Sequence, residues 1–189
     1  MKLYGSYTSP FVRHVRIVLQ EIQQPCEFIE TDQAGSAAKS PTQRVPFLED
    51  GDIFLTDSAS IIKYLREKAG QHFCQSAQEL DQLCLVNTAL DATVNLFFLK
   101  RDGVVISQVP YLQRQAARVH TTLAELEQSA ITQIAANGRF NDAQLRLGCF
   151  MGWSKFREQI DFSPFANLEN FYRQICNYPP FNTTQPPQS

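Results

Sequence analysis

The hydrophobic pattern of this 189-residue chain changes its period well before the midpoint. The first ~70 residues alternate strand and helix signals, whereas strand signals disappear from about Leu80 onward. A strand repeats its apolar positions every second residue and a helix every third or fourth, so one pattern cannot serve both structures. We therefore expect two domains of different class: an α/β domain over residues 1–72 and an all-α domain over residues 79–189.

Four short strands are expected in the first domain, at residues 2–5, 26–30, 46–49 and 53–55. Asp50-Gly51-Asp52 is a hairpin turn signal between the last two strands. One helix begins after Ser9, with Pro10 at its first position, and another begins at Asp57. Residues 33–42 are either a weak helix or a mobile loop. This order is that of a thioredoxin-like layer with parallel and antiparallel strands in one sheet.

Apolar residues at helical spacing mark four helices in the second domain, beginning near Leu83, Leu112, Leu145 and Phe165. They predict a helical bundle. The tail from Asn177 is rich in Pro, Thr and Gln, so we expect it to be irregular.

Composition excludes several functions. The net charge of -2 gives no electrostatic reason to expect nucleic acid or anionic lipid as a partner. No apolar run approaches the ~20 residues that span a bilayer, and the first residues lack the apolar core of a signal peptide, so we expect a cytoplasmic protein. The five cysteines are widely spaced without a C-x-x-C pair, so we expect neither a metal site nor a dithiol redox motif.

Three short signals in the first domain carry chemistry. Ser9 stands at a helix N-terminus, where the partial positive charge of the helix stabilises a thiolate and a hydroxyl can donate to it. On position alone, plain capping is the commoner role for such a serine. Asp57 and Ser58 open the next helix, where they would suit the ammonium and carboxylate of an α-amino acid, or would merely cap the helix.

Val45-Pro46 enters a strand after a loop. If its peptide bond is cis, the backbone N–H and C=O of Val45 turn outward and can pair with an extended peptide. If it is trans, Pro46 simply begins an edge strand. The residues alone do not distinguish the two isomers.

In combination these signals resemble a known family. Residues 1–70 look like the N-terminal domain of the glutathione transferase superfamily, of the bacterial Ser-Pro-Phe type. The resemblance rests on Met-Lys-Leu-Tyr-Gly-Ser-Tyr-Thr-Ser-Pro-Phe-Val-Arg, on Val-Pro-Phe-Leu and on Thr-Asp-Ser-Ala-Ser-Ile-Ile-Lys-Tyr-Leu at the family's usual separation. Landmarks of the helical half, such as the closing Tyr-Pro-Pro-Phe, extend the resemblance over essentially the whole chain.

The resemblance implies a role for each residue of these signals. Ser9 would hydrogen-bond the sulfur of glutathione, and Val45 would pair through its backbone with the cysteinyl unit, with Pro46 cis. Asp57 and Ser58 would hold the γ-glutamyl end. Arg44 would meet the glycine carboxylate, for which Lys39 is a weaker candidate. Tyr4 and Tyr7 rank behind Ser9 as the thiol's partner.

The implied activity is that of a glutathione transferase, which activates the glutathione thiol for attack on a small hydrophobic electrophile in detoxification. Glutathione would be the co-substrate. Possible walls of the electrophile's pocket in the second domain are Phe97, Phe98, Arg101 and Trp153. The resemblance also implies a homodimer, formed by the helix that begins at Asp57 and the first long helix of the bundle.

Other functions on this scaffold remain open. One is a non-catalytic or regulatory binding protein, and others are an isomerase or dehalogenase that uses glutathione catalytically. Serine at position 9 argues against thiol-disulfide chemistry, because serine cannot form a mixed disulfide. The family's Ser/Thr-x-x-Asp signal is replaced here by Asn141-Asp142-Ala143-Gln144, which mildly favours the binding protein. On the same helix Arg146 needs a partner such as Asp142 or must point outward.

Overall fold

The computed structural model describes residues 1–187, which form two compact units. One unit is Met1–Phe73 joined by the described residues from Cys176 on, and the other is Cys74–Ile175. The expected division at residues 72 and 79 thus lies close to the observed one, but the end of the chain belongs to the first unit instead of the helical one. Residues 188 and 189 of the expected second domain lie outside the described residues.

The first unit contains one four-stranded sheet in the order β2-β1-β3-β4. Its strands are β1 (Lys2–Gly5), β2 (Glu27–Glu30), β3 (Phe47–Asp50) and β4 (Ile53–Leu55). β1 pairs with β2 in parallel, and β3 pairs antiparallel with both β1 and β4. The predicted thioredoxin-like layer is confirmed.

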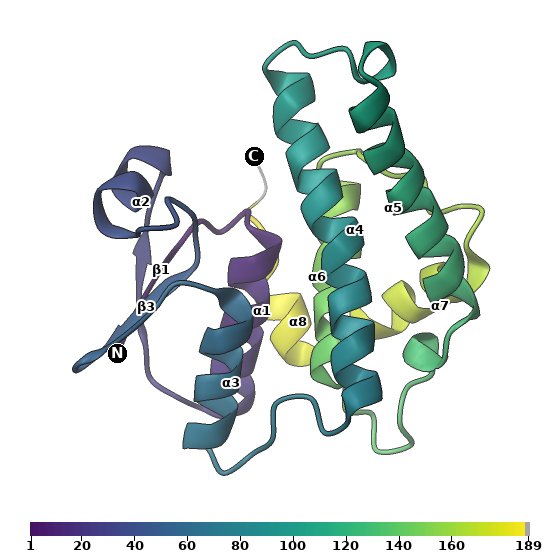
Figure 1. The fold of residues 1–189 in the computed structure, drawn as a ribbon. Coiled ribbons are helices and arrows are strands. Elements are labelled where there is room, and N and C mark those ends of the chain that lie inside the picture. The colour runs from purple at the N-terminus through teal and green to yellow at the C-terminus, as the bar shows by residue number, and fades with distance from the viewer. Residues whose placement is uncertain (188–189) are drawn as a thin grey trace. The chain divides into compact units, whose positions relative to one another are not determined.

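The helices of the first unit are α1 (Pro10–Glu21), α2 (Gln33–Lys39), α3 (Ser58–Lys68) and α8 (Pro179–Thr183). α1 and α3 lie side by side against the sheet (Figure 1). Of the two alternatives for residues 33–42, the helix is correct, because Asp32 caps α2 through a 2.8 Å hydrogen bond from the Gly35 amide. Part of the tail expected to be irregular, Pro179–Thr183, instead forms α8, which packs on α1, whereas residues 184–187 form no helix.

A close approach between β1 and α1 fixes where α1 begins. A Cβ atom added to Gly5 would lie 2.6 and 2.7 Å from the two γ-carbons of Val12. Val12 is fully buried in the first turn of α1. Glycine at the end of β1 therefore lets the loop of residues 6–9 place the N-terminus of α1 directly over the sheet's edge.

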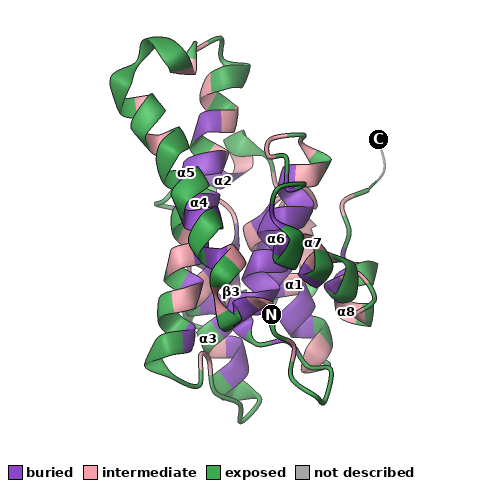
Figure 2. Ribbon diagram, turned by 90° about the vertical axis from the view of Figure 1, so that its right-hand side faces the viewer, coloured by how far each residue is buried: buried purple, intermediate pink, exposed green. Residues whose placement is uncertain are grey.

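The second unit is helical. Its α-helices are α4 (Ala77–Arg101), α5 (Pro110–Gln128), α6 (Asp142–Phe156) and α7 (Ala166–Ile175), with 3₁₀ turns at Ile106–Gln108 and Ala130–Thr132. α6 is buried along nearly its whole length (Figure 2). Its N-terminus forms a complete capping box, in which Asn141 and Gln144 each accept a bond from the other's backbone amide. Arg146 is fully buried, so the alternative that it points outward is wrong.

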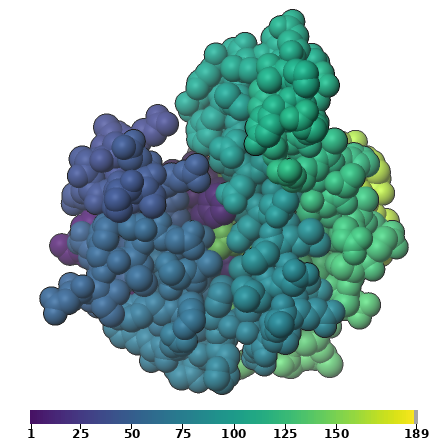
Figure 3. Space-filling view, in the orientation of Figure 1, coloured from purple at the N-terminus to yellow at the C-terminus, as the bar shows by residue number. Residues whose placement is uncertain are grey.

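By length and composition α4 is apolar enough to cross a membrane, with a mean hydropathy of 1.3 over its best window. A core helix of a globular unit passes the same test, and α4 packs against α5 and α6. On the face seen in Figure 3, the connection between α4 and α5 stands uncovered by other segments of its unit. Exposed apolar side chains there include Phe98, Val105, Val109 and Tyr111.

Candidate functional site

The strand register brings the three chemical signals to one edge of the sheet. Tyr4, near the end of β1, pairs with Phe47 at the start of β3. The loop that leads to Ser9 therefore leaves the sheet where Pro46 enters it. Leu55, which ends β4, pairs with Leu48, so the chain also leaves β4 toward this edge on its way to Asp57.

Ser9 is the N-cap of α1, as predicted. Its Oγ accepts a hydrogen bond from the Val12 amide at 3.3 Å, and the Ser9 carbonyl accepts one from the Arg13 amide at 3.0 Å. A hydroxyl carries one proton and two lone pairs. No acceptor among residues 1–187 takes the Ser9 proton, so the capping hydroxyl can still donate to an anion at the helix N-terminus.

The Val45-Pro46 peptide bond is cis, which is the isomer implied by the resemblance. Within the described residues, the amide and carbonyl of the half-buried Val45 have no hydrogen-bond partner. Both groups are therefore available to an extended peptide laid along this edge. Arg44 is exposed and forms no ion pair with the described residues, so it can meet an external carboxylate.

Asp57 is the N-cap of α3. One carboxylate oxygen, Oδ1, accepts bonds from the Ala59 amide at 2.8 Å and the Ser60 amide at 3.3 Å. The side chain is exposed, and its other oxygen can receive an ammonium. Ser58, at the first helical position, is 5% exposed. The capping interpretation of Asp57 is correct, and it leaves room for ligand binding by the same carboxylate.

The two tyrosines near Ser9 are otherwise engaged. Tyr4 donates its hydroxyl to Glu49 Oε2 at 2.9 Å, and burial together with this hydrogen bond raises the pKa of the Tyr4 phenol. Tyr7 packs its ring on Phe28 at 4.5 Å between centroids. The Arg16 guanidinium lies 4.7 Å from the centre of the Tyr7 ring. The Tyr4 hydroxyl is therefore taken by Glu49 and the Tyr7 ring is held against Phe28, so Ser9 remains the first candidate.

Lys39 ends α2 with its ammonium 4.6 Å from the centre of the Tyr4 ring. Both residues line a hollow of about 590 Å³ beneath α2. Lys39 is thus held by an aromatic face, which agrees with its lower rank as a carboxylate partner.

All four suggested wall residues of an electrophile pocket take part in contacts with aromatic rings within the helical unit. Phe97 on α4 meets Phe98 at 5.3 Å and Trp153 on α6 at 5.5 Å between ring centroids. Arg101 places its guanidinium 4.8 Å from the centre of the Phe98 ring. Phe98 is 40% exposed, so this cluster presents apolar surface to solvent as well as to its own unit.

The structure also brings together a cluster of three side chains that the sequence did not predict. Ligand atoms of Cys74, Glu79 and Asp142 lie within 4.8 Å of one another, although Asp142 is far from the other two in the chain. Burial raises the pKa of the Cys74 thiol to about 12, and both Glu79 oxygens accept backbone amides, from Gln75 at 2.9 Å and Asp142 at 3.2 Å. Glu79 therefore already serves to join the starts of α4 and α6.

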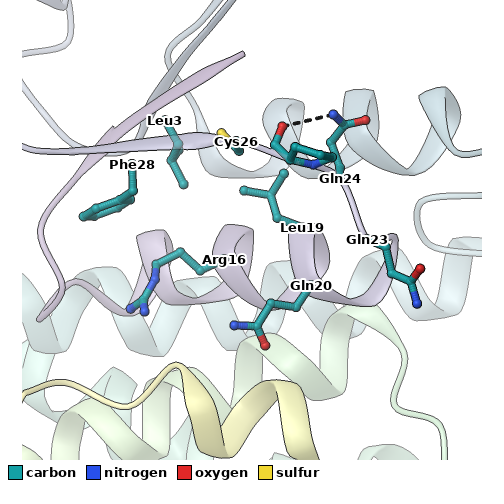
Figure 4. Close-up of a pocket in the computed structure, with 9 residues that line it drawn as sticks. Leu3, Arg16, Leu19, Gln20, Gln23, Gln24, Cys26 and Phe28 are labelled. Atoms are coloured by element: carbon teal, nitrogen blue, oxygen red, sulfur yellow. Dashed lines mark hydrogen bonds between the residues drawn. The ribbon is translucent and has the colours of Figure 1, made fainter.

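The first unit also has a hollow of about 390 Å³ between α1 and β2. Leu3, Leu19, Cys26 and Phe28 lie toward its interior, with Arg16 and glutamines at its border (Figure 4). None of the predicted site residues lines it. Burial raises the pKa of the Cys26 thiol, which disfavours the reactive thiolate there.

The chain is similar to known proteins both in sequence and in structure. Residues 3–73 match the family described as glutathione S-transferase, N-terminal domain. The chain is 25% identical to glutathione S-transferase Z2 of Arabidopsis thaliana, an alignment covering 98% of this chain and 91% of that protein. It is 28% identical to the GST-like protein YibF of Escherichia coli, with 100% of both covered.

Among solved structures, a glutathione S-transferase from Methylobacillus flagellatus with glutathione bound superposes with a TM-score of 0.84 at 24% identity. The alignment covers 98% of this chain and 99% of that one. The chain therefore has the glutathione S-transferase fold. Together, the sequence and structure matches support its assignment to the glutathione S-transferase superfamily.

Proposed function

We propose that the protein is a glutathione transferase of the Ser-Pro-Phe type, acting in the cytoplasm on a small hydrophobic electrophile. The observation that carries the proposal is the state of Ser9. Its oxygen caps α1 while its proton has no acceptor among residues 1–187, at the edge where cis Pro46 and Asp57 also lie. The bound glutathione of the Methylobacillus flagellatus relative supports the choice of ligand.

In this mechanism the peptide is held at three places before any chemistry occurs. Val45 pairs through its amide and carbonyl with the cysteinyl unit, and Asp57 with Ser58 holds the γ-glutamyl end. Arg44 receives the glycine carboxylate. These contacts bring the thiol to the N-terminus of α1, so positioning supplies part of the rate.

The thiol then loses its proton to solvent, and the thiolate accepts a hydrogen bond from Ser9 while the N-terminus of α1 stabilises its charge. The sulfur electron pair forms a bond to an electrophilic carbon of the acceptor. The displaced electron pair leaves with a leaving group, or moves to a neighbouring atom that is then protonated. Ser9 takes no covalent part.

A binding protein is the second candidate function, and the replaced Ser/Thr-x-x-Asp signal of the helical unit is the observation that favours it. The unusual Asn141-Asp142-Ala143-Gln144 start still builds a complete capping box on α6, so it gives no sign of a damaged helical unit. A homodimer through α3 and α4 remains part of the proposal, and light scattering tests it.

Calorimetric titration with glutathione tests the proposal, run beside Ser9→Gly and Ser9→Thr. Glycine is tolerated at an N-cap at a cost of a few tenths of a kcal/mol, so Ser9→Gly removes the hydroxyl without losing the helix. We expect Ser9→Gly still to bind glutathione. The pKa of the bound glutathione thiol should be higher than in the natural protein, and kcat should fall on the order of 100-fold. Ser9→Thr keeps a hydroxyl and should retain most activity.

Two results would refute the proposal. No binding of millimolar glutathione to the natural protein would remove the peptide site. Equal activity of the natural protein and Ser9→Gly would remove the role of the hydroxyl.

A further inference from the structure

The last described helix is folded back onto the helix that begins at Ser9. Arg13 of α1 donates from Nη2 to the carbonyl oxygen of Phe181 at 2.8 Å, and its guanidinium lies 3.7 Å from the centre of the Phe181 ring. Its Nε donates to Thr184 Oγ1 at 3.5 Å. These contacts join the first turn of α1 to the C-terminal segment, residues 178–184.

Arg13 is tied to Ser9 by the helix itself. The Arg13 amide donates to the Ser9 carbonyl at 3.0 Å, and the next amide back, that of Val12, donates to the Ser9 hydroxyl. Four residues of helix rise only ~6 Å, and helical side chains lean toward the N-terminus. A displacement of the Arg13 side chain is therefore felt directly by the turn that carries Ser9.

The same segment holds the far end of α1 by different residues. The Tyr178 hydroxyl donates to Glu21 Oε1 at 2.6 Å, and Glu21 Oε2 lies 2.7 Å from Arg66 Nη2 on α3. Between the two ends, Arg16 donates to the Thr184 carbonyl at 3.2 Å and the Thr183 hydroxyl donates to Gln20 at 2.8 Å. Arg16 and Gln20 leave α1 on the side of α8 (Figure 4).

We propose that the C-terminal segment is a positioning element of the glutathione site, which fixes the Ser9 hydroxyl through Arg13 and Phe181. Arg13 is 4% exposed, and a buried charge must keep its hydrogen-bonding partners. If the segment no longer supplies them, the guanidinium must move toward other partners or solvent, and the first turn of α1 loosens with it. The catalytic consequence of this inference rests on the proposed function.

The contacts at the two ends of α1 allow a matched comparison. Phe181→Leu with Thr184→Val removes the ring and hydroxyl that meet Arg13 and leaves every residue of α1 in place. Tyr178→Phe removes one partly buried hydrogen bond at the far end of the same helix. Thr184→Val alone is the milder variant, in case the double change prevents folding.

Amide hydrogen exchange in the protein without glutathione tests the positioning directly. We expect the Val12 and Arg13 amides to exchange at least ~10-fold faster in Phe181→Leu/Thr184→Val, because a loss of ~1.4 kcal/mol in local stability gives a factor of ten. In Tyr178→Phe they should exchange as in the natural protein. Equal exchange in the two variants, or no acceleration in either, would overturn the proposal.

Turnover tests the catalytic consequence. We expect Phe181→Leu/Thr184→Val to lower kcat ~10-fold with the glutathione KM changed less than ~2-fold, since Val45 and Asp57 still hold the peptide. Tyr178→Phe should keep its kcat. If the natural protein does not bind glutathione, the proposed function fails while the exchange result still decides the positioning. An unchanged kcat in the double variant would overturn the catalytic role.

Discussion

Replacing Gly5 with alanine tests whether the contact between β1 and α1 sets the position of the site. The new methyl carbon would lie 2.6 and 2.7 Å from the γ-carbons of Val12, whereas carbon atoms at rest lie ~3.5–4.0 Å apart. Val12 is fully buried, so its side chain has no solvent into which to turn. The first turn of α1 must therefore move away from the sheet by a substantial part of an ångström.

Two effects oppose each other in Gly5→Ala. Alanine restricts the unfolded chain and so adds ~0.4–1 kcal/mol of stability where its backbone is unstrained. Overpacking a well-filled core costs ~1–3 kcal/mol. Overpacking should win, with a net loss of ~0.5–2 kcal/mol and a fall of roughly 1–8 °C in the thermal midpoint for a chain of this size.

Urea and thermal denaturation measure the loss, and the double variant Gly5→Ala/Val12→Ala supplies the control. Val12→Ala removes the two γ-carbons, so the combined loss should be smaller than the sum of the two single losses. Glutathione turnover in Gly5→Ala should fall more than glutathione binding, because Ser9 begins the displaced turn. The reasoning would be refuted if Gly5→Ala were as stable as the natural protein and if the double variant lost only the sum of the two single losses.

Three further outcomes are expected. Asp57→Asn keeps the oxygen that caps α3 but removes the negative charge. Calorimetric titration should therefore show ~10-fold weaker binding of glutathione, while the thermal midpoint of unfolding stays nearly unchanged. An unchanged affinity for glutathione would contradict this expectation. Asn141→Ala removes the side chain that accepts the Gln144 amide at the start of α6, so the free energy of unfolding in urea should fall by ~1 kcal/mol. An unchanged urea midpoint would argue that this cap does not stabilise the protein. Hydrogen bonds from Lys68 and Tyr64 lower the pKa of the Asp50 carboxyl. The ionised carboxylate therefore stabilises the folded protein above the unfolded pKa of ~3.9, and this stabilisation is lost as pH falls through the folded pKa. The stability of Asp50→Asn should accordingly depend less on pH in that acid range than that of the natural protein.

Local sequence signals predicted the elements well because their causes lie within a few residues. The Ser9 hydroxyl and the Asp57 carboxylate accept hydrogen bonds from amides two or three positions ahead, so the starts of α1 and α3 could be predicted. The change of hydrophobic period likewise separated the sheet unit from the helical one near Phe73.

Features that depend on distant residues could not be predicted in this way. The isomer of Val45-Pro46 was open from its neighbours alone, and the structure has it cis. The tail looked irregular because Pro and Thr are poor helix formers, yet α8 forms where Phe181 and Thr184 meet Arg13. Tertiary context overrides propensity at such places.

The sequence by itself determined the two kinds of domain, the helix caps and the residue types of the candidate site, because each depends on short-range hydrogen bonds and on the period of apolar side chains. Only the tertiary structure decided that Ser9, Val45 and Asp57 share one edge of the sheet, since strand register is a relation between residues far apart in the chain. It also decided that Tyr4 and Tyr7 are engaged elsewhere and that the chain's end returns to α1, because partners in a folded core are chosen by packing.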